Sequence, residues 1–343
     1  MTQTIIGIDI GFGFTKATDG KDFLIFKSVY GEAVDLQIQE KLLGESNHDE
    51  HIQIEIDDTA YFVGELAERQ SSNRSFTLDQ KQFISSSSQV LALSALSKLV
   101  HEPTQSIKLV VGLPIGHYRQ YKDELAEMLK KTHLFTAIDA HHQRIDYTIT
   151  VTDVRVLPQP IGTVMDRLLG TLGMPKNQRF ATDKIGIIDV GFRTTDYTIS
   201  DKGRYSERGS LTTRNGISRA FVKISTKLKE ACDIDIEIYR LFEAVDSGSI
   251  KIRGKSYDLK SVSEASFKQL ATAIAADANT TWADDWDIDA IMITGGGGAV
   301  LAPYIESQLE GVTIPIQQDL DYRLHNVRGY LKYGLYTWQK GEA

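Results

Sequence analysis

One short segment occurs twice in this chain, and it limits the possible folds more than any other feature. Residues 8–15 read IDIGFGFT, and residues 188–195 read IDVGFRTT. Asp, Gly, Phe and Thr keep the same spacing in both copies, and each copy follows an apolar, β-branched run that is typical of a buried strand. Two copies half a chain apart predict two similar domains, not a solenoid of short repeats.

Apolar strand patterns and helical patterns alternate along the whole chain, which predicts an α/β class with some hairpins. Expected strands are Thr4–Ile10, Ile107–Ile115, Asp146–Leu157, Ile185–Val190, Ala290–Thr294 and Val312–Ile316. Hairpins are expected at Asp19-Gly20, at Asp57-Asp58 and within Thr194–Ser206, and a loop at Lys176–Lys184. Expected helices are Ser87–Val100, Tyr118–Lys131, Ile161–Leu172, Ile217–Ala231, Ser263–Trp282, Ala299–Leu309 and Asn326–Gln339.

Composition excludes several classes of protein. The formal net charge is −8, which argues against broad electrostatic binding to nucleic acid. Cys232 is the single cysteine, so neither an intrachain disulfide nor a cysteine-based zinc site is possible. The first residues lack a basic segment followed by an apolar run, and no stretch is apolar for the ~18–20 residues that a membrane span needs. We therefore expect a soluble, cytoplasmic protein.

The repeated segments have the chemistry of a phosphate site. A glycine-rich turn presents backbone N–H groups to an anion, and ligands gather at the carboxyl ends of strands in α/β sheets. Asp9 and Asp189 could hold Mg²⁺ through water, and Lys16 could neutralise phosphate charge. The hydroxyls of Thr15, Thr194 and Thr195 could donate to phosphate oxygens. A single Asp-x-Gly after a strand is usually only a turn, but the pair predicts two turns that hold one triphosphate between domains.

A third glycine-rich segment, ITGGGG, lies at residues 293–298 between an expected strand and an expected helix. Ordering four consecutive glycines costs much conformational entropy on folding. Such a segment is therefore expected where a flat ligand lies against the backbone, or where a helix N-terminus meets phosphate. The segment is not a Walker A loop, because no Gly-Lys-Ser/Thr follows, and it lacks the dinucleotide-binding pattern.

The order of these motifs resembles the superfamily of actin, heat-shock chaperone and sugar kinase ATPases. Its phosphate-1, connect-1, phosphate-2 and adenosine motifs match D9-IGFGFTK16, LPQP at 157–160, IIDVGFRTTD at 187–196 and TGGGG at 294–298. Within it, GLPIGHYRQYKDEL at 112–125, RVLPQPIG at 155–162 and NVRGYLKYG at 326–334 are most similar to prokaryotic actin-like proteins of the ParM type and their archaeal relatives.

The resemblance implies a two-lobed, ribonuclease H-like ATPase fold, with 1–158 plus 326–343 as domain I and 159–325 as domain II. It implies ATP, or GTP, and Mg²⁺ in a central cleft, with Asp9, Gln159 and Asp189 as catalytic residues and both aspartates near the metal. Gln159 stands where ParM-type members often have Glu; it can orient water but is no strong base. The implied nucleotide-binding residues are Gly11, Phe12, Gly13, Phe14, Thr15, Lys16, Gly191, Phe192, Arg193, Thr194, Thr195, Gly216, Gly295, Gly296, Gly297 and Gly298.

Two of these positions keep alternatives open. Arg193 stands where the family often has a small residue, and it either contacts phosphate or is a solvated residue of the turn. Gly216 is expected near the ribose, at the start of the helix Ile217–Ala231.

The leading hypothesis is an actin-like ATPase that assembles head-to-tail into cytoskeletal filaments, with hydrolysis driving turnover. The resemblance further implies plasmid or DNA segregation through a DNA-binding adaptor protein, without direct contact to nucleic acid or membrane. A small-molecule kinase of the same superfamily is the first alternative, although no acidic motif for activating a substrate hydroxyl is visible. A non-polymerising, nucleotide-switched adaptor is the second.

Overall fold

The computed structural model describes residues 3–34, 51–76, 86–315 and 321–339. By its internal contacts the chain divides into two units, Met1–Gln178 with Leu324–Ala343, and Arg179–Arg323. The first unit extends past the expected boundary at residue 158, because α5 (Gln159–Leu168) packs on α11 (His325–Gln339) within that unit. The assignment of residues to actin-like domains I and II stays a prediction.

The first unit is built on one curved sheet, and its described strands follow the order β3-β2-β1-β8-β10-β9-β5-β6-β4-β7. β8 runs parallel to β1 and to β10, and the other neighbouring strands are antiparallel. The strands are β1 (Thr4–Ile10), β2 (Phe14–Thr18), β3 (Phe23–Lys27), β4 (Val29–Glu32), β5 (Ile52–Ile56), β6 (Thr59–Val63), β7 (Arg74–Phe76), β8 (Thr104–Leu113), β9 (Thr132–Ile138) and β10 (Arg144–Pro158).

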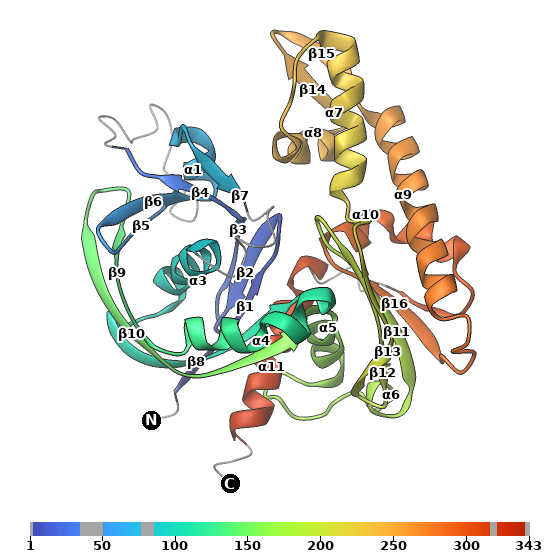
Figure 1. Cartoon of the computed structure of the whole chain (residues 1–343), viewed down its shortest axis with the longest axis horizontal. Helices are drawn as coiled ribbons and strands as arrows, with labels where there is room; N and C mark the ends of the chain where they lie inside the picture. The colour runs from blue at the N-terminus through green and yellow to red at the C-terminus, as the bar shows by residue number, and fades with distance from the viewer. Residues whose placement is uncertain (1–2, 35–50, 77–85, 316–320, 340–343) are drawn as a thin grey trace. The chain divides into compact units, whose positions relative to one another are not determined.

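The curved sheet wraps around α3 (Ser86–Leu99), which contacts β1 to β6 and β9 (Figure 1). Leu91, Leu93 and Leu96 of this helix are fully buried, so α3 is the centre of the unit's apolar core. Helix α11 packs on β1, β8 and α5. The other helices among the described residues of this unit are α1 (Glu65–Gln70) and α4 (Ile115–Leu129).

The second unit has a smaller sheet with the strand order β13-β12-β11-β16-β17 and a separate hairpin, β14-β15. Helix α9 packs on both α7 and α10, and α10 contacts β11 and β16. The strands are β11 (Lys184–Val190), β12 (Thr195–Asp201), β13 (Arg204–Thr213), β14 (Ser249–Ile252), β15 (Lys255–Asp258), β16 (Ala290–Thr294) and β17 (Thr313–Ile314). The helices are α6 (Arg179–Thr182), α7 (Ser218–Cys232), α8 (Phe242–Ser247), α9 (Lys260–Thr281) and α10 (Gly296–Ile305), with 3-10 turns at Ile238–Leu241, Glu306–Gln308 and Tyr322–Leu324.

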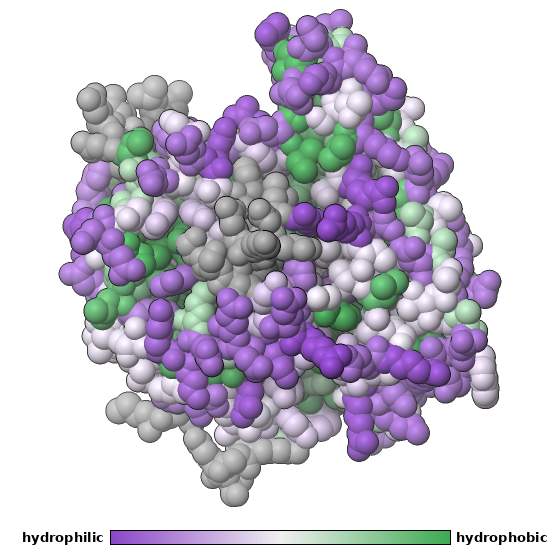
Figure 2. All heavy atoms as spheres, in the orientation of Figure 1, coloured by the Kyte–Doolittle hydropathy of each residue, from purple (hydrophilic) through white to green (hydrophobic). Residues whose placement is uncertain are grey.

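Apolar residues are concentrated inside each unit. In the second unit the core includes Ile188, Tyr197 and Ile274, all buried. In the view of Figure 2 most of the surface is hydrophilic, and apolar residues appear in small separated areas. This distribution is that of globular units with their own cores.

The two units share a five-strand arrangement. In β3-β2-β1-β8-β10 and in β13-β12-β11-β16-β17, the first three strands are antiparallel neighbours and the next two pairs are parallel. The repeated sequence segment ends the central strand of each set, β1 and β11. The expectation of two similar domains is confirmed at this level.

Most expected elements are present, but several differ in their bounds. The strand expected at Ile107–Ile115 is β8 (Thr104–Leu113), and the helix expected from Tyr118 begins at Ile115. The expected strands at Thr4–Ile10 and Ala290–Thr294 have those bounds. The helix expected from Ala299 begins at Gly296, the helix expected from Ile161 begins at Gln159 directly after Pro158, and the expected loop at 176–184 contains α6. Val312–Ile316 is only partly testable, because residue 316 lies outside the described residues.

Candidate functional site

The first repeated segment forms a tight turn between β1 and β2. The Gly11 N–H donates to the Phe14 carbonyl oxygen at 3.1 Å, and the ladder pairs Asp9 with Lys16. A β-carbon on Gly11 would lie 2.8 Å from that carbonyl oxygen, so the turn needs a residue without a side chain at this position. The strand register therefore brings Lys16 beside Asp9.

Asp9 is buried at the end of β1, and both of its carboxylate oxygens are bonded. Lys16 Nζ lies 3.0 Å from Oδ2, and Gln159 Nε2 donates to Oδ1 at 2.9 Å. Gln159 reaches Asp9 from the first position of α5, which follows the carboxyl end of β10. Three site residues predicted from two separate motifs thus lie in one contact network within the first unit.

The side chains of two other residues of the first repeated segment, Thr15 and Phe12, are buried. Thr15 is buried, and its Oγ1 lies 2.9 Å from Ser28 Oγ, so this hydroxyl is engaged inside the unit. Successive residues of a strand face opposite sides, which places Thr15 on the face away from Lys16. Phe12 is also buried, and the Gly13 carbonyl oxygen accepts from the Ser28 N–H at 3.0 Å. The backbone of the turn is therefore fixed by Ser28, which lies between β3 and β4, as well as by β2.

The second repeated segment forms the same turn between β11 and β12. The Gly191 N–H donates to the Thr194 carbonyl oxygen at 2.9 Å, and the ladder pairs Asp189 with Asp196. Asp189 and Asp196 are both buried. The position opposite the first aspartate is thus a lysine in one copy and a second aspartate in the other.

The start of α7 is fastened to this second turn through backbone hydrogen bonds. The N–H groups of Gly216, Ile217 and Ser218 donate to carbonyl oxygens of the turn residues Arg193, Gly191 and Phe192, at 3.1, 3.1 and 2.8 Å. A β-carbon on Gly216 would lie 2.2 Å from the carbonyl carbon of Arg193. Gly216 is therefore required for this close approach.

The glycine-rich segment lies beside Asp189. Gly295 has a φ of 84°, and a β-carbon there would lie 2.3 Å from Asp189 Oδ1. Gly296 begins α10, and a β-carbon on Gly297 would lie 2.9 Å from Val190 Cγ1. The N-terminal end of α10, with its unsatisfied N–H groups, is therefore next to the second repeated turn.

The predicted site residues divide between the units. Asp9, Lys16 and Gln159 come together in the first unit, and Asp189, Gly216 and Gly295 surround the second turn in the other. Each half combines an aspartate at a strand end with a glycine turn, which suits phosphate and a hard cation.

Comparison with known families decides the identity of this fold. The family described as "Actin like proteins N terminal domain" matches residues 7–162, and "Archaeal actin homologue MreB-like, C-terminal" matches residues 187–307. The chain is a prokaryotic actin-like protein. Its fold is the mixed α/β, two-lobed actin-like fold, as expected from the sequence.

Solved structures of similar proteins cover nearly the whole actin-like chain. A 15-stranded ParM filament from Clostridium botulinum is 26% identical, with a TM-score of 0.80 over 97% of this chain and 99% of that one. A non-polymerisable quadruple mutant of pCBH ParM is also 26% identical, with a TM-score of 0.78 and the same coverage. An archaeal actin homologue in complex with ADP is similar in fold, with 18% identity, a TM-score of 0.79 and 97% and 99% coverage. A comparison with curated proteins gave no match.

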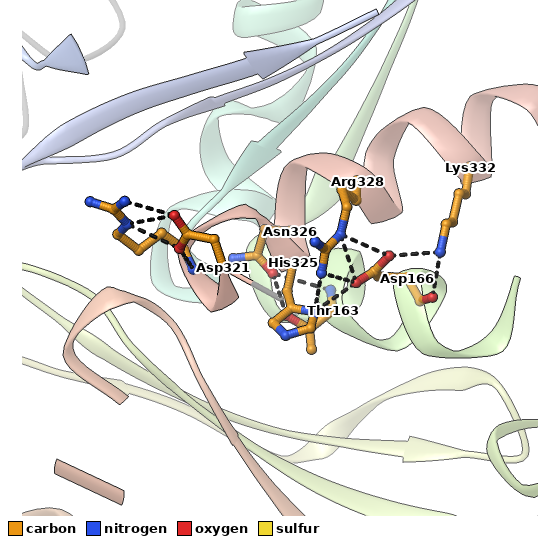
Figure 3. Close-up of polar contacts among 8 residues, drawn as sticks. Thr163, Asp166, Asp321, His325, Asn326, Arg328 and Lys332 are labelled. Atoms are coloured by element: carbon orange, nitrogen blue, oxygen red, sulfur yellow. Dashed lines mark hydrogen bonds and ion pairs between the residues drawn. The ribbon is translucent and has the colours of Figure 1, made fainter. Parts of the chain in front are cut away.

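A further group of polar residues, not expected from the sequence, joins α5 to α11 (Figure 3). The buried carboxylate of Asp166 accepts from Arg328 Nη2 at 2.9 Å and from Lys332 Nζ at 2.7 Å, and His325 Nδ1 lies 2.6 Å away. Lys332 also donates to the Asp166 carbonyl oxygen at 2.7 Å. One acid on α5 thus binds three residues of α11.

The cations determine the protonation of Asp166. Burial alone would raise the pKa of this carboxyl, but hydrogen bonds from His325 and Arg328 and the charge of Lys332 hold it well below its ordinary value. Beside this cluster the helices touch backbone to backbone, since a β-carbon on Gly329 would lie 1.6 Å from the Gly162 carbonyl oxygen. The α5–α11 pair is therefore held by both shape and charge.

A sequence signal for this cluster existed. Arg328 and Lys332 are four residues apart on the terminal helix, and therefore share one face. The acid that faces them, Asp166, is 162 residues before Arg328 and 166 before Lys332, and nothing in the sequence pairs the two helices.

Two negative findings concern the described part of the chain. Within it, no group of three or more His, Cys, Asp or Glu side chains is arranged to hold a metal ion. Among the helices of the described ranges, none combines the length and the apolar character that crossing a membrane requires.

Proposed function

We propose that this actin-like protein binds Mg-ATP and hydrolyses it, with the two repeated turns as the two halves of the nucleotide site. The observation that carries the proposal is the paired turn itself: the same backbone turn occurs in both units, with a buried aspartate at the same position of each. The ADP complex of an archaeal actin homologue and a Bacillus thuringiensis ParM with AMPPNP, both of similar fold, support a nucleotide as the ligand.

In the first unit, Lys16 would contact phosphate, and Asp9 would bind the water shell of the cation. Gln159 would orient the attacking water. Because its Nε2 donates to Asp9, its Oε1 is the atom of the amide that can accept a hydrogen bond from water. A neutral amide orients water but does not take its proton strongly, which favours slow hydrolysis. Thr15, with its hydroxyl on Ser28, would contribute through its backbone, as would Gly11, Phe12, Gly13 and Phe14.

In the second unit, the backbone of the turn Gly191–Thr195 would cradle phosphate, and Asp189 would order water near the cation. Gly295–Gly298 would lie against the adenine and ribose, where the absent side chains leave backbone accessible, and Gly216 would lie near the ribose. Of the two alternatives for Arg193, we favour phosphate contact, because its side chain is half-buried and its Nη1 is buried, which does not fit a solvated residue of the turn.

The residues present fit Mg²⁺ held chiefly by the nucleotide. Mg²⁺ in such sites keeps several waters and takes one or two carboxylates plus substrate phosphates. This agrees with the lack of a preassembled metal cluster in the described residues and with the engagement of both Asp9 oxygens by Lys16 and Gln159. When bound, Mg²⁺ would neutralise phosphate charge. GTP is an equally suitable nucleotide by this chemistry.

We further propose that nucleotide-bound copies assemble head-to-tail into cytoplasmic filaments and that hydrolysis drives their turnover. The similarity to a ParM filament over 97% of this chain supports assembly. Segregation of plasmid or other DNA through a DNA-binding adaptor protein is the task that the ParM resemblance favours. The net charge of −8 supports an indirect contact with DNA.

Sedimentation tests the proposal. The protein is incubated with MgATP, MgADP or no nucleotide over a range of protein and salt concentrations, the pellet is examined by negative-stain microscopy, and phosphate release is measured in the same samples. We expect filaments with MgATP and phosphate release that follows assembly. Protein that binds no nucleotide in calorimetry contradicts the nucleotide site, and protein that binds nucleotide but stays in the supernatant contradicts the filament.

A further inference from the structure

A single tryptophan stands out on the surface of the second unit. Trp286, in the segment between α9 and β16, is 91% exposed, whereas Leu172, the next large apolar residue in exposure among the described residues, is 76% exposed. Tryptophan is enriched at the energetic centres of protein interfaces and is costly to leave in water. We therefore expect Trp286 to contact a binding partner.

The segment that carries Trp286 is rigidly held. Asp285 is buried and accepts from Lys184 Nζ at 2.9 Å and from Arg208 Nη2 at 2.5 Å. Asp289 accepts from the Lys184 backbone N–H at 2.8 Å. On the other side Trp282 is buried, with its Nε1 donating to the Gly209 carbonyl oxygen at 2.8 Å. A side chain presented by a fixed loop loses little entropy on binding, so Trp286 is prepared for contact.

The surroundings of Trp286 are acidic. Asp284, Asp285, Asp287 and Asp289 occur within six residues, and the cations bound to them are Lys184 and Arg208. The carboxylates outnumber these cations by two. A partner surface that matches both the indole and this charge carries arginine or lysine, and a guanidinium over an indole ring adds a cation–π contact.

A surface of that kind lies elsewhere in the same unit. The β14-β15 hairpin turns at Arg253-Gly254, with φ values of 48° and 82°, which are typical of a type I′ turn. Lys251, Arg253 and Lys255 are exposed at this tip, and within the described ranges none of them forms an ion pair. The tip therefore offers three cations on a short, fixed hairpin.

The two surfaces belong to opposite ends of one helix. The hairpin ends directly before α9 and the Trp286 segment follows directly after it, and α9 has 22 residues, a length of about 33 Å (Figure 1). One copy cannot bring its own two surfaces together. A contact between unlike surfaces of successive copies produces a filament when the rotation from copy to copy does not close into a ring.

We propose that the Arg253 tip of one copy docks on the Trp286 segment of the next copy, with Arg253 on the indole and Lys251 and Lys255 toward the aspartates. The occupant of the Trp286 surface is thus a second copy of this chain. The inference rests on the proposed filament and names its contact surface within the second unit.

Two variants test the two surfaces separately. Trp286→Ala should raise the protein concentration required for MgATP-dependent assembly about thirtyfold, and Arg253→Glu at least about tenfold. Both side chains are exposed and outside the proposed nucleotide site, so ADP affinity and the thermal unfolding midpoint should match the wild type. Leu134→Ala and Lys131→Glu, which alter exposed residues of the first unit, are the matched controls and should assemble like the wild type.

Mixing the variants tests the pairing itself. Trp286→Ala retains an intact tip, and Arg253→Glu retains an intact tryptophan segment, so one good contact remains possible between them. The mixture should form a capped heterodimer in sedimentation velocity with MgATP, while each variant alone remains monomeric at the same concentration. This result is specific to a head-to-tail contact of these two surfaces.

The outcomes separate this inference from the proposed function. Wild type that forms filaments, with both variants assembling equally well, overturns the docking and leaves the filament intact. Loss of assembly in Trp286→Ala alone, without heterodimers in the mixture, assigns another occupant to the tryptophan and also overturns the pairing. If the wild type forms no filaments, a wild-type dimer that either variant abolishes still supports the docking, and a wild-type monomer at every concentration overturns it.

Discussion

The turn after β1 and the turn after β11 have the same hydrogen bond and register but different neighbours. Asp9 is held by the side chains of Lys16 and Gln159, whereas Asp189 faces Asp196 across the ladder and has Gly295 against one oxygen. The first aspartate is thus matched by a cation of its own strand pair. The second stands beside another buried acid and bare backbone.

This difference suggests a division of labour. Two buried carboxylates on neighbouring strands repel each other unless a cation balances them, whereas a Lys–Asp pair is balanced in the absence of ligand. We infer that the bound cation matters more at the second turn, where Asp189 and Asp196 are neighbours, than at the first, where Lys16 lies beside Asp9. The predictions below test this contrast, beginning with the largest effect.

Replacing Asp189 should have the greatest consequence. In Asp189→Asn the side-chain shape is kept but the charge that orders water around the cation is lost, so phosphate release should fall on the order of 10³-fold. Part of the nucleotide affinity should remain, because the glycine turn and the start of α10 are unchanged. Phosphate release and calorimetry with MgATP measure the two effects. Asp201→Asn, at the exposed far end of β12, should keep wild-type turnover, and an active Asp189→Asn would show that the site is misassigned.

A third buried acid, Asp166, extends the comparison to an aspartate that is bound by two cations, Arg328 and Lys332, and by His325. Asp166→Asn removes the charge that His325, Arg328 and Lys332 share, so we expect a loss of about 3 kcal/mol in the free energy of unfolding. Urea unfolding at pH 7 measures this loss. Asp123→Asn, an exposed change on α4, should alter stability by less than about 0.5 kcal/mol.

The same variant gives a pH test. The pKa of Asp166 is lowered by folding from an ordinary value of 3.8, so its contribution is complete above that pH and decreases as the pH falls toward the folded value. The stability difference between wild type and Asp166→Asn should therefore be constant from pH 7 to 5 and become smaller below about pH 4. A difference that grows in acid would contradict the assigned ion pairs.

Gly295 tests the bare backbone beside the second aspartate. In Gly295→Ala the new β-carbon would meet Asp189 Oδ1 at 2.3 Å, at a φ of 84° that disfavours a side chain. We expect about 2 kcal/mol of lost stability and a matching loss of ATP affinity, seen in thermal unfolding with and without MgATP. Gly254→Ala has a similar φ of 82° but open space, so it separates backbone strain from the clash.

How far the sequence could predict these features depends on whether the information was local. The strands β1 and β16 were recognisable because their apolar runs are continuous and end at Asp-x-Gly or Gly-rich turns. The start of α10 at Gly296 was not recognisable, because glycine is a poor helix former. The glycines are needed there for close contact with neighbouring residues. A β-carbon on Gly298 would lie 3.2 Å from Ile293 Cγ2, a contact visible only in the folded unit.

The candidate site follows the same rule. The motifs predicted Asp9, Lys16 and Gln159 individually, but the contacts among them depend on strand register and on the position of α5 after β10. The direction of Thr15 is set in the same way. Its hydroxyl is a suitable phosphate donor by residue type, yet the pleat of β2 turns it toward Ser28.

Thr15 therefore provides the smallest effect and the most specific test of the first turn. In Thr15→Val the buried hydroxyl is replaced by a methyl group of similar size, which leaves Ser28 Oγ without this partner, 2.9 Å away in the wild type. Unfolding free energy should fall by about 1 kcal/mol, while ATP affinity and phosphate release stay at wild-type values. Ser28→Ala is the matched control and should give a similar loss of stability. A tenfold fall in ATP affinity for Thr15→Val, but not for Ser28→Ala, would mean that the hydroxyl reaches the nucleotide and that the first turn rearranges on binding.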